Sequence, residues 1–164
     1  MVKRLLDLTL VVALLFAVIM AGLGLAVDRD AHAQPSSLRL VTVLASSQRI
    51  TTTTGSDVVN IGENLNVRGA YLTLDVTGVM TTPVITLTVQ AKDPVSSNYE
   101  AIFTATSGVT TTGTHTYLIY PGVGSAGGDV VQTLSYPLPA EWRVSVAHSD
   151  TDPITYSVGA LLVP

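Results

Sequence analysis

The chain has no cysteine among its 164 residues. Disulfide bonds, thiolate nucleophiles and cysteine metal ligands are therefore excluded. The part after residue 33 has the size of an ordinary single domain and can bury one hydrophobic core without covalent help. Its stability must come from packing and hydrogen bonding.

Charged residues are also few. Only 12% of the chain is Asp, Glu, Lys or Arg, and the 12 acids outnumber the 8 Lys and Arg residues. A surface that binds nucleic acid needs clustered basic side chains, because these displace counterions from the phosphates. We find no such cluster after residue 33 and expect no nucleic-acid partner. A polar surface with few charges repels copies of itself only weakly and suits close packing.

Residues that commonly carry catalysis are scarce. His115 and His148 are the only histidines after residue 33, and each stands in a strand-like segment that favours a structural role. The sequence has no G-x-S-x-G elbow, although a Ser-His-Asp triad can assemble from residues far apart in the chain. We predict that the protein is not an enzyme and uses no cofactor.

Two weaker binding features remain. Asp150 and Asp152 are carboxylates in one loop, the ligand type that calcium prefers, but the loop is too short for a known calcium loop and a hairpin turn explains it better. Trp142 is the only tryptophan, and an exposed tryptophan would suit stacking on a sugar. Its alternation with Val144 and Val146 predicts burial instead. Four tyrosines on different segments are a further candidate aromatic face: Tyr99, Tyr117, Tyr120 and Tyr136.

The first 33 residues have the organisation of a secretory signal. Lys3 and Arg4 precede an uncharged apolar run at 8–27, and the sequence A-H-A that ends at Ala33 fits the site of signal peptidase. We therefore assign residues 1–33 to a signal peptide. The alternative is a membrane anchor, since about 20 apolar residues can cross a bilayer as a helix, and 8–27 would then be the only membrane segment. Both interpretations predict a secreted or cell-surface protein.

The remaining residues are rich in Thr, Val, Ser and Gly, which favour strands and turns over helices. Apolar and polar side chains alternate along several segments, as in half-buried strands. We predict an all-β fold, an antiparallel β-sandwich of the jelly-roll-like type with about eight strands, and keep a closed barrel as the alternative. The eight expected strands are 38–45, 69–77, 84–91, 99–105, 114–120, 130–134, 142–148 and 154–160.

Turn residues suggest how these strands connect. We expect a hairpin between the second and third strands, around 80–83, and another between the last two. Residues 34–56 are expected to form a Thr/Ser-rich strand and arm, with 46–56 reaching a neighbouring molecule. Residues 57–164 would form the β-sandwich domain.

From about Arg68 to Pro164 the chain resembles a family of small structural proteins encoded by tailed bacteriophages and prophages. Four segments carry the resemblance in matching order and spacing: GAYLTLDVT at 69–77, TPVITLTVQAKDP at 82–94, GTHTYLIYPG at 113–122 and PLPAEWRVSVAHSDTDPITYSVGA at 137–160. These are strand and turn signatures. The resemblance implies a β-sandwich subunit of a multi-copy assembly, with no catalytic residues to carry over.

The secretory segment departs from that family, because virion proteins assembled in the cytoplasm need no export. The combination predicts an exported, non-enzymatic structural protein whose phage-like β-sandwich self-associates and forms or decorates an extracellular or surface assembly. The alternative is a secreted module that binds carbohydrate or a cell-wall polymer.

Overall fold

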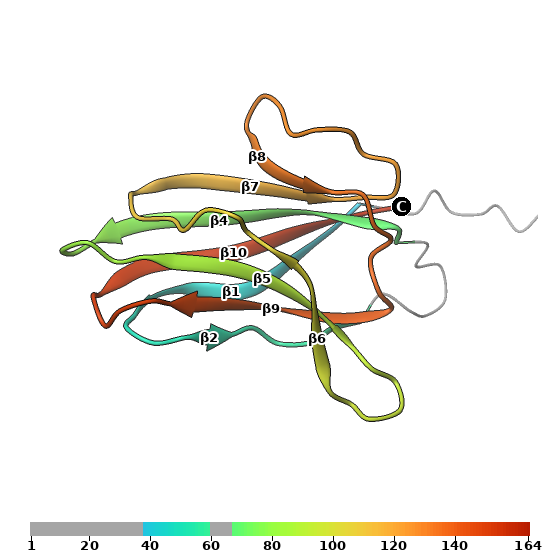
Figure 1. Ribbon diagram of the computed structural model, residues 1–164, viewed down its shortest axis with the longest axis horizontal. Coiled ribbons are helices and arrows are strands. Elements are labelled where there is room, and N and C mark those ends of the chain that lie inside the picture. The colour runs from blue at the N-terminus through green and yellow to red at the C-terminus, as the bar shows by residue number, and fades with distance from the viewer. Residues whose placement is uncertain (1–37, 60–66) are drawn as a thin grey trace, which may run out of the picture. The chain divides into compact units, whose positions relative to one another are not determined.

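The computed structural model describes residues 38–59 and 67–164, which form β-strands and no helix (Figure 1). The all-β class is therefore confirmed. The expected signal or anchor at 1–33 lies outside the described residues, and within the described part no helix is long and apolar enough to cross a membrane. The strands are β1 (Arg39–Arg49), β2 (Thr53–Thr54), β3 (Val58–Val59), β4 (Gly69–Val79), β5 (Ile85–Lys92), β6 (Tyr99–Thr104), β7 (Gly113–Ile119), β8 (Val130–Leu134), β9 (Glu141–His148) and β10 (Ile154–Val163).

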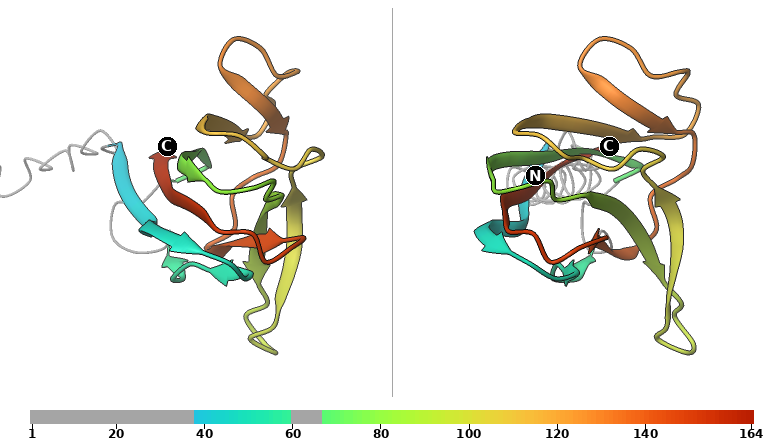
Figure 2. Two further views of the ribbon diagram at one scale, coloured as in Figure 1. Left: turned by 90° about the vertical axis from the view of Figure 1, so that its left-hand side faces the viewer. Right: turned by 60° about the vertical axis from the view of Figure 1, so that its left-hand side comes forward.

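The strands form two sheets that pack against each other as in a β-sandwich (Figure 2). Sheet A has the order β1-β10-β4-β7-β8, and sheet B has the order β2-β9-β5-β6, with β3 also pairing with β9. The described part has ten strands instead of about eight, because β2 and β3 are two-residue strands. All pairs are antiparallel except β7 and β8, which run parallel. The expectation of a purely antiparallel sandwich is thus wrong at β8, because residues 120–129 carry the chain back along the sheet before β8 begins.

Alternation along the strands builds the core between the two sheets. In β4 and β10 of sheet A, and in β5 and β9 of sheet B, nearly every second side chain is buried. The largest fully buried side chains are Trp142, Tyr117 and Tyr156, and aliphatic residues from both inner faces fill the space around them. Removing this apolar surface from water is the main stabilising contribution, about 25 cal/mol per Å².

Both expected hairpins are wrong. β4 pairs with β10 and β7, whereas β5 pairs with β9 and β6, so the connection from β4 to β5 crosses from sheet A to sheet B. The connection from β9 to β10 crosses back in the same way. Alternation identifies the side chains that face the core, but it is the same in either sheet and cannot identify the partner strand. The two crossings lie together, since Met80 N–H donates to the carbonyl oxygen of Pro153 (3.1 Å).

The expected arm at 46–56 is part of the sandwich. β1 continues to Arg49 and pairs with β10 over its whole length, while β2 pairs with β9. The division between 34–56 and 57–164 therefore does not separate two structural parts, and the described residues belong to one compact unit. The Arg49 guanidinium fastens the end of β1 by donating, at 2.6 to 2.9 Å, to the carbonyl oxygens of Ala45, Ser47 and Tyr156.

Candidate functional site

Trp142 lies in the core and is no platform for a sugar. Its side chain is 0% exposed, which confirms the burial predicted from alternation. The four tyrosines considered as an aromatic face do not share one. Tyr117 is buried between the sheets, Tyr99 lies on the outer side of sheet B, and Tyr120 and Tyr136 follow β7 and β8.

Asp150 and Asp152 bind backbone N–H groups. Asp152 Oδ2 accepts from Thr82 N–H (3.1 Å), Asp150 Oδ2 accepts from Val84 N–H (3.0 Å), and Asp150 Oδ1 accepts from Asp152 N–H (3.0 Å). The two carboxylates thus join the β9–β10 crossing to the β4–β5 crossing. Within the described ranges, no three His, Cys, Asp or Glu side chains gather as metal ligands.

Asp152→Asn is expected to lower stability at neutral pH and to reduce acid sensitivity. The hydroxyl of Thr81 and the N–H of Thr82 hold the pKa of Asp152 below its usual range. A lowered carboxylate pKa stabilises the folded state above the unfolded-state value of about 3.9, and this contribution is lost as the pH falls through the folded-state pKa. Urea midpoints from about pH 7 to pH 2 test this. A decline as steep as that of the wild type would contradict it.

His148, Tyr156 and Arg49 form a polar cluster between the sheets. His148 Nε2 lies 3.2 Å from Tyr156 Oη, and Arg49 Cζ lies 4.5 Å from the centre of the Tyr156 ring. Burial lowers the pKa of His148, the charge of Arg49 lowers it further, and Asp150 opposes the shift. From the sequence, His148 was expected to stand alone in its strand. In the structure, Tyr156 of the opposite sheet lies next to it. His115 is half-buried on β7 and takes no part in this cluster.

The lowered pKa of His148 predicts a second pH effect, near neutrality. The unfolded chain has a histidine pKa of about 6.5, so it binds more protons than the folded state once the pH falls below about 7. Stability should therefore decrease as the pH falls from about 7.5 to the folded-state pKa and then stay level with respect to this group. His148→Gln should remove that step in the thermal midpoint, whereas Asp152→Asn should retain it. If the His148→Gln variant still shows this step in the thermal midpoint, the step comes from the titration of another group.

The outer face of sheet A carries two neighbouring rows of side chains that cross the strands β1, β10, β4 and β7. The first, the apolar row, consists of Leu40, Leu161, Tyr71 and Leu118. The second, the threonine row, consists of Thr42, Gly159, Thr73 and Thr116. This face therefore places apolar surface beside a line of hydroxyl groups.

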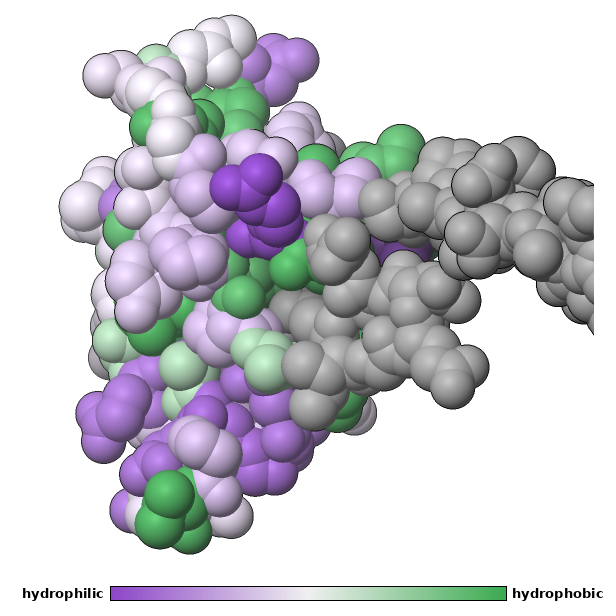
Figure 3. Space-filling view, turned by 90° about the vertical axis from the view of Figure 1, so that its right-hand side faces the viewer, coloured by the Kyte–Doolittle hydropathy of each residue, from purple (hydrophilic) through white to green (hydrophobic). Residues whose placement is uncertain are grey.

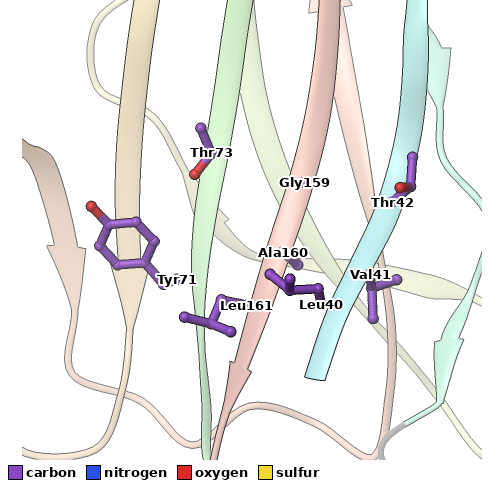
Figure 4. A pocket seen from close by; sticks show the side chains of 8 residues that line it. All are labelled: Leu40, Val41, Thr42, Tyr71, Thr73, Gly159, Ala160 and Leu161. Atoms are coloured by element: carbon purple, nitrogen blue, oxygen red, sulfur yellow. The ribbon is translucent and has the colours of Figure 1, made fainter. Parts of the chain in front are cut away.

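Two hollows flank β4 on this face. The first has a volume of about 440 Å³. Gly159 forms its floor, with Thr42 on one side and Thr73 and Tyr71 on the other (Figure 4). The second, about 460 Å³, lies between β4 and β7, and Asp129 is one of its lining residues. Tyr71 and Thr73 line both hollows and form the ridge between them. Neither Tyr71 nor Gly159 was expected from the sequence to belong to a site, although the alternation along 69–77 puts Tyr71 on the outward side.

The free edges of the two sheets differ in how well they are protected against pairing with another chain. On β1 the register shifts twice, and a side chain at Gly55 would meet Val43 within 2.7 Å, so the 53–56 segment passes close to that strand. β8 has five residues, and β2 and β3 have two each. β6 carries one charge, at Glu100, and contains neither proline nor lysine. At its far end Gln132 Nε2 donates to the carbonyl oxygen of Thr104 (3.5 Å), so the open part of this edge is its first half.

The backbone of β6 turns hydrogen-bonding groups outward. Asp93 N–H donates to the carbonyl oxygen of Asn98. Because hydrogen-bonded pairs alternate along an antiparallel ladder, the N–H and C=O groups of Tyr99 and Ala101 face away from β5. The β5–β6 hairpin projects from the body, and its exposed tip carries Val95. Figure 3 shows this lower end as hydrophilic except at its tip.

Comparison of the chain with protein-family models, with curated proteins and with solved structures gives no match. No function is carried over from another protein. A proposal for the function therefore starts from the two surfaces described above, the β6 edge and the outer face of sheet A. The polar side chains of Asp150, Asp152 and His148 all contact other segments of the fold.

Proposed function

We propose that this chain is an exported, non-enzymatic structural subunit that assembles with copies of itself. The observation that supports this most is the β6 edge, where the outward backbone groups of Tyr99 and Ala101 pair with no strand of the described part. Such an edge is a template for a strand of another molecule, and main-chain hydrogen bonds supply the affinity. The neighbour's β6 is the simplest partner, because two antiparallel copies related by a twofold axis form one continuous sheet.

Three further observations support the proposal. The charged residues are few, so copies repel each other weakly. The segments between Gly69 and Ala160 resemble phage and prophage structural proteins, which act as many copies, and we assign the sandwich to their jelly-roll-like class. The secretory organisation of residues 1–33 supports export to the cell surface or beyond.

The oligomeric state of the purified protein tests the proposal. Light scattering during size exclusion should give a mass above that of one chain, with the assembled fraction rising with concentration. Ala101→Pro should shift the population towards single chains, because proline removes the outward N–H and is tolerated on an edge strand where that N–H is not bonded within the sheet.

Ala101→Ser is the matched control, because it changes the same side chain and keeps the N–H. It should assemble like the wild type, and circular dichroism should show the same strand content in all three proteins. A wild type that stays a single chain at every concentration, or an Ala101→Pro variant that assembles normally, would contradict the proposal.

A further inference from the structure

Gly159 leaves an open space on the outer face of sheet A. The residue lies inside β10, between β1 and β4. Its φ is outside the left-handed region, and a Cβ built on it would meet nothing within 4 Å. A glycine inside a strand costs roughly 0.5–1 kcal/mol relative to alanine. Strand glycines of this kind often mark a place where a ligand approaches the backbone.

We propose that the outer face of sheet A binds a neutral oligosaccharide across its strands. One sugar ring would lie in the hollow over Gly159, and the chain would pass over the ridge formed by Tyr71 and Thr73 into the second hollow. The volumes of about 440 and 460 Å³ are within the range of about 300–1,000 Å³ that small-molecule sites occupy.

The two rows on this face match the two kinds of surface on a sugar. A pyranose ring has an apolar face of C–H groups and a rim of hydroxyl groups. The apolar row offers the phenol ring of Tyr71 and the neighbouring leucines to the C–H face. Thr42 and Thr73 of the threonine row offer hydroxyl groups that both donate and accept hydrogen bonds, whereas Thr116 is almost fully buried. Figure 4 shows the hydroxyl groups of Thr42 and Thr73 on opposite sides of Gly159.

Charge and hydrogen bonding argue against two other ligands. Among the residues that line the hollows there is no lysine or arginine, and Asp129 is acidic. Asp75 adds a second carboxylate on the same face, beside Thr114, so a phosphate or an anionic polymer would be repelled. A peptide that binds by strand addition needs an unpaired edge. Of the strands that line the first hollow, β10 and β4 are paired on both sides, and β1 is an edge strand whose register shifts twice.

The length of the face sets the size of the ligand. Four strands take part, and neighbouring strands lie about 4.8 Å apart, so the two rows span about 14 Å from β1 to β7. This length suits a short oligosaccharide more than a single ring. The site lies on sheet A and the open β6 edge on sheet B, so saccharide binding and self-association are separate properties.

Titration calorimetry with a panel of neutral hexasaccharides tests the proposal: cellohexaose, xylohexaose, laminarihexaose, mannohexaose and chitohexaose. The purified wild-type protein should bind at least one of them. Tyr71→Ala should bind that sugar about tenfold more weakly, because the stacking surface is lost. Gly159→Val should also lose at least about tenfold, because the side chain fills the hollow above an otherwise unchanged strand.

Ser157→Val is the matched control for Gly159→Val. It places the same side chain on the same face of β10, two residues away and outside the lining of both hollows, and it should bind like the wild type. Tyr136→Ala, which removes an exposed tyrosine elsewhere, should do so too. Failure of the wild type to bind any of the five sugars would overturn the proposal, as would full binding by Gly159→Val. A Gly159→Val variant that loses self-association would show that a second copy occupies the hollow, and this too would overturn it.

Discussion

Trp142→Ala should lower the free energy of unfolding by about 3–5 kcal/mol, the largest effect expected of any single truncation in this chain. Trp142 is 0% exposed and heads the fully buried side chains by volume. It lies on β9 between Val58 of β3 and Ala91 of β5, so its removal opens a cavity where three strands of sheet B meet. Small domains have a total stability of about 5–15 kcal/mol, so the variant should be close to unfolding.

Urea denaturation followed by far-UV circular dichroism measures this effect, because the variant has no tryptophan left for fluorescence. Trp142→Phe is the control. It keeps much of the ring, and the indole N–H that it removes has no acceptor among the described residues, so no hydrogen bond is lost with it. We expect a clearly smaller destabilisation than for alanine. A loss below about 1 kcal/mol for Trp142→Ala would mean that the side chain is not packed as described.

The sequence predicted which side chains face the core, but it did not predict which strands pair with each other. Alternation along β4, β5, β9 and β10 identified the inward side chains, including Trp142, because burial follows from a period of two. The turn residues at 80–83 and between the last two strands suggested hairpins at places where the chain in fact crosses between sheets. A short connection with turn residues can join two strands of one sheet or cross from one sheet to the other. The local sequence does not distinguish these two cases. The proximity of His148 to Tyr156 depends on the second crossing and was therefore not foreseen.

The candidate site residues show the same difference between what a local pattern predicts and what depends on distant segments. Asp150 and Asp152 were expected in a hairpin turn, but they lie in the connection that crosses from β9 to β10. Their bonds to Thr82 and Val84 join segments about seventy residues apart in the sequence and leave no local pattern. Tyr71 is a different case, since its outward direction was readable from the neighbouring leucines. Its position beside the hollow over Gly159 became visible only from the strand order of sheet A. A strand glycine by itself does not reveal whether its open side faces solvent or another part of the chain.

Gly69 and Gly159 allow a direct test of that distinction, because the same substitution should have opposite effects. A Cβ on Gly69 would lie 2.3 Å from the carbonyl oxygen of Ile119 and 2.5 Å from a ring carbon of Tyr120. The oxygen belongs to the backbone of β7, so β4 and β7 must separate at that end. Gly69→Ala should therefore lower the free energy of unfolding by about 1–3 kcal/mol or more.

Gly159→Ala should instead raise the free energy of unfolding by roughly 0.5–1 kcal/mol, because the new methyl group meets nothing within 4 Å and the unfolded chain loses conformational freedom. Urea denaturation of both variants beside the wild type gives the two differences. If Gly159→Ala is destabilising, the glycine is required by the fold and its open side needs no ligand to explain it. If it is stabilising, the fold does not require the glycine, as the proposed saccharide site predicts.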